Sequence, residues 1–278
     1  MSSIHVPNPR RRRSLSILAA TLVAVGPAVV PAIATADPGE PTLVLVHGAF
    51  ADATSWDAVA AELRGRGYPV VVVNNPLRGP RNDAAALQGV LDGINGPVVL
   101  VGHSYGGAVI TNTHNPKVKA NVYIAAFAPA QGEFVQGLLD PIRFPGSQLL
   151  PPALQVRVVD DPTGVAGRNV DGYIDAPYFR TIFAQDVSIE TAADMYAHQL
   201  SAALNANLEP SGSPSWATTP SWYLVSGEDR VIPAAAQRFM ASRAAAGTTR
   251  EISSSHASLV SQPVTVAETI VEAANSVR

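Results

Sequence analysis

The chain has 278 residues, of which 47% are hydrophobic and 15% are charged, and its formal net charge is −3. This composition excludes an intrinsically disordered protein, and it lacks the basic excess with which nucleic-acid-binding proteins hold phosphates. The sequence contains no cysteine, which excludes a disulfide scaffold, a thiolate metal site and a cysteine nucleophile.

The first 36 residues have the pattern of a secretory signal peptide. Four arginines at 10–13 precede an apolar stretch over 15–30, and Ala34-Thr35-Ala36 follows. A basic start, an apolar middle and a small-x-small end predict export with cleavage after Ala36. The uninterrupted apolar part is too short for stable membrane insertion. Arg12-Arg13-Ser14-Leu15 also resembles a twin-arginine signal, so both export routes stay open. We expect a secreted mature protein of residues 37–278.

The mature chain alternates short apolar strands with helix-length segments. Strands without polar alternation are typical of a parallel sheet covered on both faces. The expected fold class is therefore α/β, with a mostly parallel central sheet and helices on both faces. The pattern predicts strands at 42–46, 70–73, 98–101, 118–127, 221–225 and 249–252, and helices at 52–64, 82–93, 233–246 and 263–276, with one more ending near 114.

Residues 128–219 interrupt this alternation. Proline and glycine recur there, and helical stretches such as 188–205 occur without strong strands between them. A structureless loop of that length is uncommon inside a compact domain. We therefore expect an inserted helical cap at approximately 130–219, within a single domain of residues 37–278.

The main chemical motif is Gly102-x-Ser104-x-Gly106, which lies between the strand at 98–101 and the helix after it. In this setting the serine sits on a tight strand-to-helix turn, where the glycines make room for a strained backbone. The following helix N-terminus offers N–H groups to a developing oxyanion. The same pattern occurs in ordinary glycine turns, but its place between strand and helix favours Ser104 as a nucleophile.

A serine nucleophile needs a base, and the base needs an acid to orient it. Among six histidines, His256 follows the last predicted strand, where active-site groups collect in parallel sheets. Asp229 follows the strand at 221–225 and completes the order serine, acid, histidine that such sheets use. Glu133 and Glu228 are the alternative candidates for the acid.

The loop His47-Gly48-Ala49-Phe50 follows the first strand. Backbone N–H groups of Ala49 and Tyr105 are expected to converge as an oxyanion hole, and Gly48 permits the close approach. We expect His47 to stabilise this turn and His103 to point away from the nucleophile.

Four segments, LVLVHGAFADATSWD, VVLVGHSYGG, SWYLVSGEDRVIP and SSSHASLV, occur in this order and resemble the α/β-hydrolase superfamily. The branch that the chain resembles is the small serine esterase group, which includes plant methylesterases, hydroxynitrile lyases and bacterial relatives. The resemblance covers residues 37–278. It implies the α/β-hydrolase fold, with Ser104 as the nucleophile, His256 as the base, Asp229 as the acid, and Ala49 and Tyr105 as oxyanion donors.

The resemblance implies a hydrolase that cleaves short-chain or aryl carboxylic esters through an acyl-enzyme, without a cofactor or a metal. The sequence has no phosphate-binding loop, dinucleotide fingerprint or His-Glu-x-x-His motif. A lactonase, an amidase and a cofactor-free perhydrolase use the same triad and stay open. A hydroxynitrile lyase is disfavoured, since Ala257 stands where that enzyme carries a lysine. A non-catalytic small-ligand-binding protein on this fold is the alternative of another class.

The cap is expected to shape the substrate pocket, with Phe50 and Phe127 as candidate lining residues. An apolar pocket favours a neutral small-molecule ester over a charged substrate. The signal carries four of the 19 basic residues and none of the 22 acidic ones, so the mature chain has a formal charge of −7. We therefore expect no nucleic-acid partner, and the sequence leaves the oligomeric state open.

Overall fold

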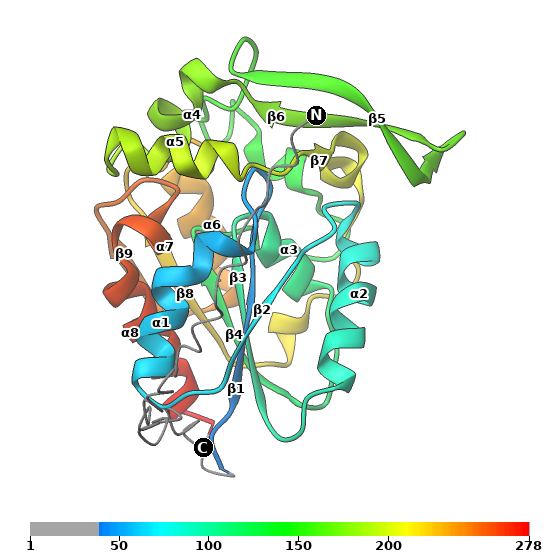
Figure 1. The fold of residues 1–278 in the computed structure, drawn as a ribbon. Helices are drawn as coiled ribbons and strands as arrows, with labels where there is room; N and C mark the ends of the chain where they lie inside the picture. The colour runs from blue at the N-terminus through cyan, green and yellow to red at the C-terminus, as the bar shows by residue number, and fades with distance from the viewer. Residues whose placement is uncertain (1–38, 278) are drawn as a thin grey trace, which may run out of the picture. The chain divides into compact units, whose positions relative to one another are not determined.

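The computed structural model describes residues 39–277, so the predicted signal peptide lies outside the described residues. Its centre is a six-stranded sheet in the order β2-β1-β3-β4-β8-β9, in which every neighbouring pair runs parallel (Figure 1). The α/β class and the parallel sheet are thereby confirmed. The strands are β1 (Thr42–Val46), β2 (Val70–Val73), β3 (Val98–His103), β4 (Val118–Ile124), β8 (Ser221–Ser226) and β9 (Thr249–Ile252).

Helices cover both faces of this sheet because alternate strand residues point to opposite sides. Leu43 and Leu45 of β1 pack in a core with α1 and α8, whereas Val44 and Val46 pack in a second core with α2, α3 and α6. Full burial of each such side chain stabilises the fold by roughly 1.5–3 kcal/mol. The helices are α1 (Asp57–Gly65), α2 (Pro80–Asp92), α3 (Tyr105–Thr111), α6 (Ala234–Ala244) and α8 (Pro263–Asn275).

The predicted elements differ from the observed ones mainly at their ends. The segment 52–64 starts as a 3-10 turn, η1 (Ala53–Trp56), because the Asp52 side chain accepts a hydrogen bond from the Thr54 N–H before α1 begins. Strand β4 ends at Ile124, and 125–127 form the loop that leads out of the sheet. No helix in residues 39–277 is long and apolar enough to cross a membrane.

The cap between β4 and β8 contains more strand than the sequence predicted. Besides α4 (Ala176–Phe183) and α5 (Ile189–Ala197), it holds an antiparallel sheet of β5 (Leu154–Val165), β6 (Arg168–Ile174) and β7 (Ala202–Ala203) (Figure 1). The expected helical stretch 188–205 ends early, and the chain passes through β7 into the 3-10 turn η3 (Leu204–Leu208). Leu154, Val156 and Val158 of β5 alternate with polar residues, but Val156 and Val158 are exposed, so this alternation does not mark a half-buried face.

Arg78, in the loop after β2, anchors the β5–β6 hairpin to the sheet. Its guanidinium donates two hydrogen bonds to the Asp171 carboxylate, at 2.8 and 2.7 Å, and a third to Asp161 Oδ2 at 3.1 Å. Ser201 Oγ donates to the same Asp171 carboxylate at 2.8 Å. Asp171 is 1% exposed, so this forked ion pair is a buried link between the cap and the core.

Candidate active site

Ser104 lies on the turn between β3 and α3, with backbone angles of φ +53° and ψ −123°. Such a conformation costs an L-residue on the order of 1–3 kcal/mol, so the surrounding structure must enforce it. The neighbouring Gly106 packs directly on β1, where a Cβ atom would lie 2.5 Å from the Val46 carbonyl oxygen. A side chain at position 106 would therefore push the turn away from the sheet.

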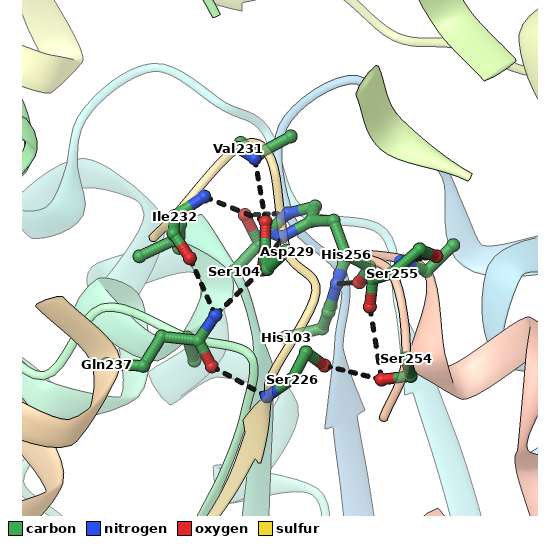
Figure 2. Close-up of polar contacts among 12 residues, drawn as sticks. His103, Ser104, Ser226, Asp229, Val231, Ile232, Gln237, Ser254, Ser255 and His256 are labelled. Atoms are coloured by element: carbon green, nitrogen blue, oxygen red, sulfur yellow. Dashed lines mark hydrogen bonds and ion pairs between the residues drawn. The ribbon is translucent and has the colours of Figure 1, made fainter. Parts of the chain in front are cut away.

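The structure brings together the three side chains that the sequence singled out (Figure 2). Ser104 Oγ lies 2.8 Å from His256 Nε2, and His256 Nδ1 lies 2.6 Å from Asp229 Oδ2. An ionised carboxylate only accepts, so Nδ1 carries the proton and Nε2 accepts from the Ser104 hydroxyl. His256 is fully buried, and Ser104 and Asp229 are nearly so. This arrangement suits a base that removes the serine proton.

The Asp229 carboxylate is held by four donors. Its Oδ1 accepts from the N–H groups of Val231, at 2.7 Å, and Ile232, at 2.9 Å. Its Oδ2 accepts from His256 and from Gln237 Nε2, the latter at 2.8 Å (Figure 2). Gln237 also donates to the Ile232 carbonyl and accepts from the Ser226 N–H. Sequence reasoning missed this residue, because a lone glutamine in a helix has no motif to mark it.

Two further histidines, His47 and His103, support the site, and neither forms a hydrogen bond with the Ser104 hydroxyl. His103 Nε2 donates to the His256 carbonyl oxygen at 2.9 Å, and the two rings lie 4.7 Å apart. Burial lowers the pKa of His103 well below its ordinary value, and the electrostatic interaction with the His256 ring acts in the same direction, whereas the hydrogen bond to the His256 carbonyl opposes it. His47 Nδ1 donates to the Gly48 carbonyl, and its Nε2 accepts from the Asn75 N–H, which fixes the turn after β1.

The rival acids are occupied elsewhere. Glu133 accepts two hydrogen bonds from the Arg243 guanidinium, one of them at 2.8 Å. Glu228 accepts a hydrogen bond from the Ser253 hydroxyl. Ser253 lies on the same loop as His256, but His256 itself does not donate to Glu228. The His256 ring is therefore paired with Asp229 and with neither glutamate.

The predicted oxyanion donors lie beside the nucleophile. Ala49 and Tyr105 line the same cavity as Ser104, and within residues 39–277 neither amide donates a hydrogen bond to another group. A Cβ at Gly48 would lie 2.6 Å from Ser104 Cβ, so this glycine permits the loop to approach the serine. The Phe50 N–H is bound to the Leu200 carbonyl at 3.1 Å and holds the loop in place. Two residues with unbonded N–H groups therefore line the cavity that opens at Ser104.

The side chain of Tyr105 is fixed by a buried carboxyl group. Its hydroxyl donates to Asp83 Oδ2 at 2.9 Å, and the Arg78 N–H donates to the same carboxyl group at 3.1 and 3.2 Å. Burial raises the pKa of Tyr105 well above its ordinary value, and the Asp83 charge raises it further. Burial also raises the pKa of Asp83, although its hydrogen-bond donors oppose that shift. The tyrosine hydroxyl is therefore a permanent donor at neutral pH.

A cavity of about 270 Å³ opens at Ser104. Both predicted lining residues, Phe50 and Phe127, border it, and the cap contributes most of the other apolar walls. None of the described residues that line it is charged. They are Ala49, Phe50, Ser104, Tyr105, Phe127, Val135, Gln136, Leu139, Leu149, Leu154, Leu204, Asn207, Leu208 and Val231. Phe50 also lines a second cavity of about 240 Å³, which lies beside Ala58 of α1 and Met195 of α5.

No group of three or more histidine, aspartate or glutamate side chains in residues 39–277 could hold a metal ion.

Comparison with known proteins assigns the family. The sequence model of the Alpha/beta hydrolase family matches residues 43–269, which is most of the chain. The chain therefore belongs to the alpha/beta hydrolase family, as its motifs predicted. A carbendazim-hydrolysing esterase from Nocardioides sp. (strain SG-4G) is 35% identical over 111 residues. That match covers 34% of this chain and 46% of the esterase, less than half of its length.

Solved structures show the same fold over most of the chain. Polyneuridine aldehyde esterase superposes with a TM-score of 0.70 at 20% identity, covering 84% of this chain and 98% of its own. A pyrethroid hydrolase from Sphingobium faniae JZ-2 gives 0.69 at 23% identity, covering 85% and 98%. A methylesterase from Arabidopsis gives 0.67 at 16% identity, covering 85% and 99%. At these identities the likeness concerns the fold.

Proposed function

We propose that this protein is a serine hydrolase that cleaves carboxylic esters through an acyl-enzyme intermediate. The observation that carries the proposal is the buried hydrogen-bond chain from Ser104 through His256 to Asp229, which begins at a serine that lines an apolar cavity. The names of the similar proteins, which are esterases and hydrolases, support the same class of reaction.

In the proposed reaction, Ser104 Oγ attacks the ester carbonyl carbon while His256 Nε2 takes its proton. The carbonyl oxygen becomes negative and accepts hydrogen bonds from the N–H groups of Ala49 and Tyr105. Collapse of this intermediate breaks the bond to the alkoxy oxygen, and His256 returns the proton to the leaving alcohol. A water molecule then attacks the acyl carbon while His256 takes its proton. Collapse of this second intermediate breaks the bond between the acyl carbon and Ser104 Oγ, and His256 returns the proton to Ser104 as the acid is released. Asp229 holds the neutral imidazole in the required tautomer and stabilises the imidazolium that forms when His256 takes a proton.

The cavity favours a neutral ester with a short acyl chain or an aryl group. Its apolar walls would have to desolvate a charged substrate without a partner charge among the lining residues. Its volume of about 270 Å³ is at the small end of ligand pockets, which suits a small-molecule substrate.

A fluorophosphonate probe and a panel of p-nitrophenyl esters test the proposal. We expect covalent labelling at Ser104, and we expect Ser104→Ala to abolish the label and lower kcat by at least about 10⁴-fold. Ser213→Ala is a matched control, because Ser213 is exposed and its side chain has no hydrogen bond in the described chain. A wild-type protein that takes no label and hydrolyses none of the esters contradicts the proposal and favours a non-catalytic ligand-binding protein.

The same panel separates the reactions that share this triad. Adding a lactone, an anilide and a peracid assay to the esters compares the lactonase, amidase and perhydrolase alternatives directly. We expect a higher kcat/KM for the esters than for the anilide, because an alkoxide or phenoxide leaves more easily than an amine. A lactone also expels an alkoxide, so a lactone that is turned over faster than the acyclic esters favours the lactonase.

We also propose that the enzyme is exported, on the basis of residues 1–36. The expected product is a mature chain that begins at Asp37, identified by mass spectrometry of the protein in the culture medium. Replacement of Arg12 and Arg13 by lysine stops twin-arginine export but leaves the general secretory route open. An N-terminus at Met1 in the exported protein contradicts the predicted cleavage.

A further inference from the structure

One segment of the cap contacts both loops that carry the triad partners of Ser104. The segment runs from Arg180, near the end of α4, to Val187 before α5, and we name it the cap strap. Arg180 Nε donates to the Val187 carbonyl at 3.1 Å and closes the strap into a compact turn. Its contacts reach across to the core, so it links the position of the cap to that of the triad.

On the acid side, the strap holds the residues on either side of Asp229. Gln185 Nε2 donates to the Glu228 carbonyl at 2.7 Å. Arg230 Nη1 donates to the carbonyl of Thr181 at 2.9 Å. The loop that presents the acid is thus tied to the cap immediately before and immediately after the carboxylate.

On the base side, the strap holds the residue that precedes His256. Asp186 Oδ2 accepts from the Ser255 N–H at 2.8 Å and from the Ser261 hydroxyl at 2.9 Å. The ring of Phe183, which is 1% exposed, meets the His256 ring edge to face at 4.8 Å. The base is therefore restrained both through its backbone and through its ring.

The two loops follow different strands, β8 and β9, yet Asp229 and His256 must stay within hydrogen-bond distance of each other. A misplacement of about 1 Å can cost on the order of 100-fold in rate. We propose that Gln185 and Asp186 are positioning residues that set the spacing between these loops, so that the triad is fully assembled only when the cap is seated. This inference rests on the proposed ester hydrolysis at Ser104.

Three variants test the inference. Asp186→Ala removes the acceptor for the base loop, Asp186→Asn keeps an acceptor oxygen, and Gln185→Ala removes the donor to the acid loop. Asp160→Ala is the matched control, because Asp160 is an exposed cap aspartate whose ion pair with Arg168 lies on the hairpin. The concentration of active sites is titrated for each variant from the end point of fluorophosphonate labelling, and kcat is expressed per titrated site.

We expect Asp186→Ala to lower kcat per titrated site about tenfold, with KM within twofold of the wild type. Asp186→Asn should restore most of the lost kcat, and Asp160→Ala should leave kcat and KM unchanged. A merely structural role would reduce the number of titratable sites but leave kcat per site unchanged. Gln185→Ala, expected to lower kcat about fivefold, keeps the test valid if Asp186→Ala fails to fold. The inference is overturned if kcat per site stays within twofold of the wild type in both alanine variants. Absence of labelling in the wild type instead refutes the proposed function.

Discussion

Gln237 is a buried side chain that connects Asp229, the acid of the proposed triad, to the sheet. It donates to Asp229 and to the Ile232 carbonyl, and it accepts from the Ser226 N–H at the end of β8. An apolar replacement of similar size leaves that N–H buried without an acceptor, which costs about 1–3 kcal/mol. It also removes one of the four donors to the carboxylate.

We therefore expect Gln237→Leu to lower the free energy of unfolding by about 2 kcal/mol and kcat about tenfold. Urea unfolding and steady-state kinetics measure the two effects. Gln155→Leu is the control, because Gln155 is in the cap hairpin and its side chain bonds only the Pro152 carbonyl. Wild-type kinetics in Gln237→Leu would mean that three donors suffice to orient Asp229.

Glu133, the alternative acid, has a structural role that pH can reveal. Burial raises the pKa of Glu133, but hydrogen bonds from Arg243 and the Ala130 N–H lower it more, so the result lies below the ordinary value of 4.5. A carboxyl group with a depressed pKa in the folded state stabilises the fold above its unfolded pKa, and this stability is lost as the pH falls through the folded value.

We expect Glu133→Gln to be about 1 kcal/mol less stable than the wild type at pH 7, with the difference shrinking progressively below pH 4.5. Ester hydrolysis at pH 7 should be unchanged, because Glu133 has no contact with His256. Chemical unfolding across pH 3–7, together with kcat, checks both statements. A large loss of kcat in Glu133→Gln would instead favour Glu133 as the acid of the triad.

At the scale of elements, the sheet was predictable and the cap hairpin was not. Strands such as β1 and β3 are buried on both faces, so an unbroken apolar run marks them in the sequence. Strand β5 exposes Val156 and Val158, and its partner β6 supplies hydrogen bonds that no local pattern specifies. The observed helix ends also differ from the predicted ones. A capping residue such as Asp52 sets the first turn through a hydrogen bond to a nearby N–H, and the apolar periodicity does not report this bond.

Arg78 anchors the β5–β6 hairpin, so replacing Arg78 should destabilise the hairpin. Breaking a buried ion pair by removing one partner leaves the other charge uncompensated, which costs about 3–5 kcal/mol. We expect Arg78→Ala to destabilise the protein by about 3 kcal/mol and to speed hydrogen exchange in β5 and β6. Arg168→Ala, which breaks only an exposed pair with Asp160, should cost less than about 1 kcal/mol. Equal effects in the two variants would contradict the anchoring role.

Across the whole molecule, parallel strands gather the loops after β1, β3, β8 and β9 at one edge of the sheet, and these loops carry the candidate site. The motif around Ser104 and the positions of Asp229 and His256 after predicted strands could therefore be read from the sequence, although Glu133 and Glu228 stayed open as alternatives to Asp229. The cap side of the cavity, with Val135, Leu149 and Leu204 among its walls, could not be predicted in this way. Those positions depend on packing between the cap and the core, which no spacing in the sequence encodes.

Phe50 lines both cavities, so we expect it to limit the length of the acyl chain that the proposed site accepts. We expect Phe50→Ala to join them and to raise kcat/KM for long-chain p-nitrophenyl esters about tenfold relative to short-chain ones, as measured with a graded acyl series. An unchanged chain-length profile would show that another residue separates the cavities. If Phe50 is the partition, replacing this one residue would admit bulkier substrates to the proposed site while Ser104, His256, Asp229 and the cap stay as they are.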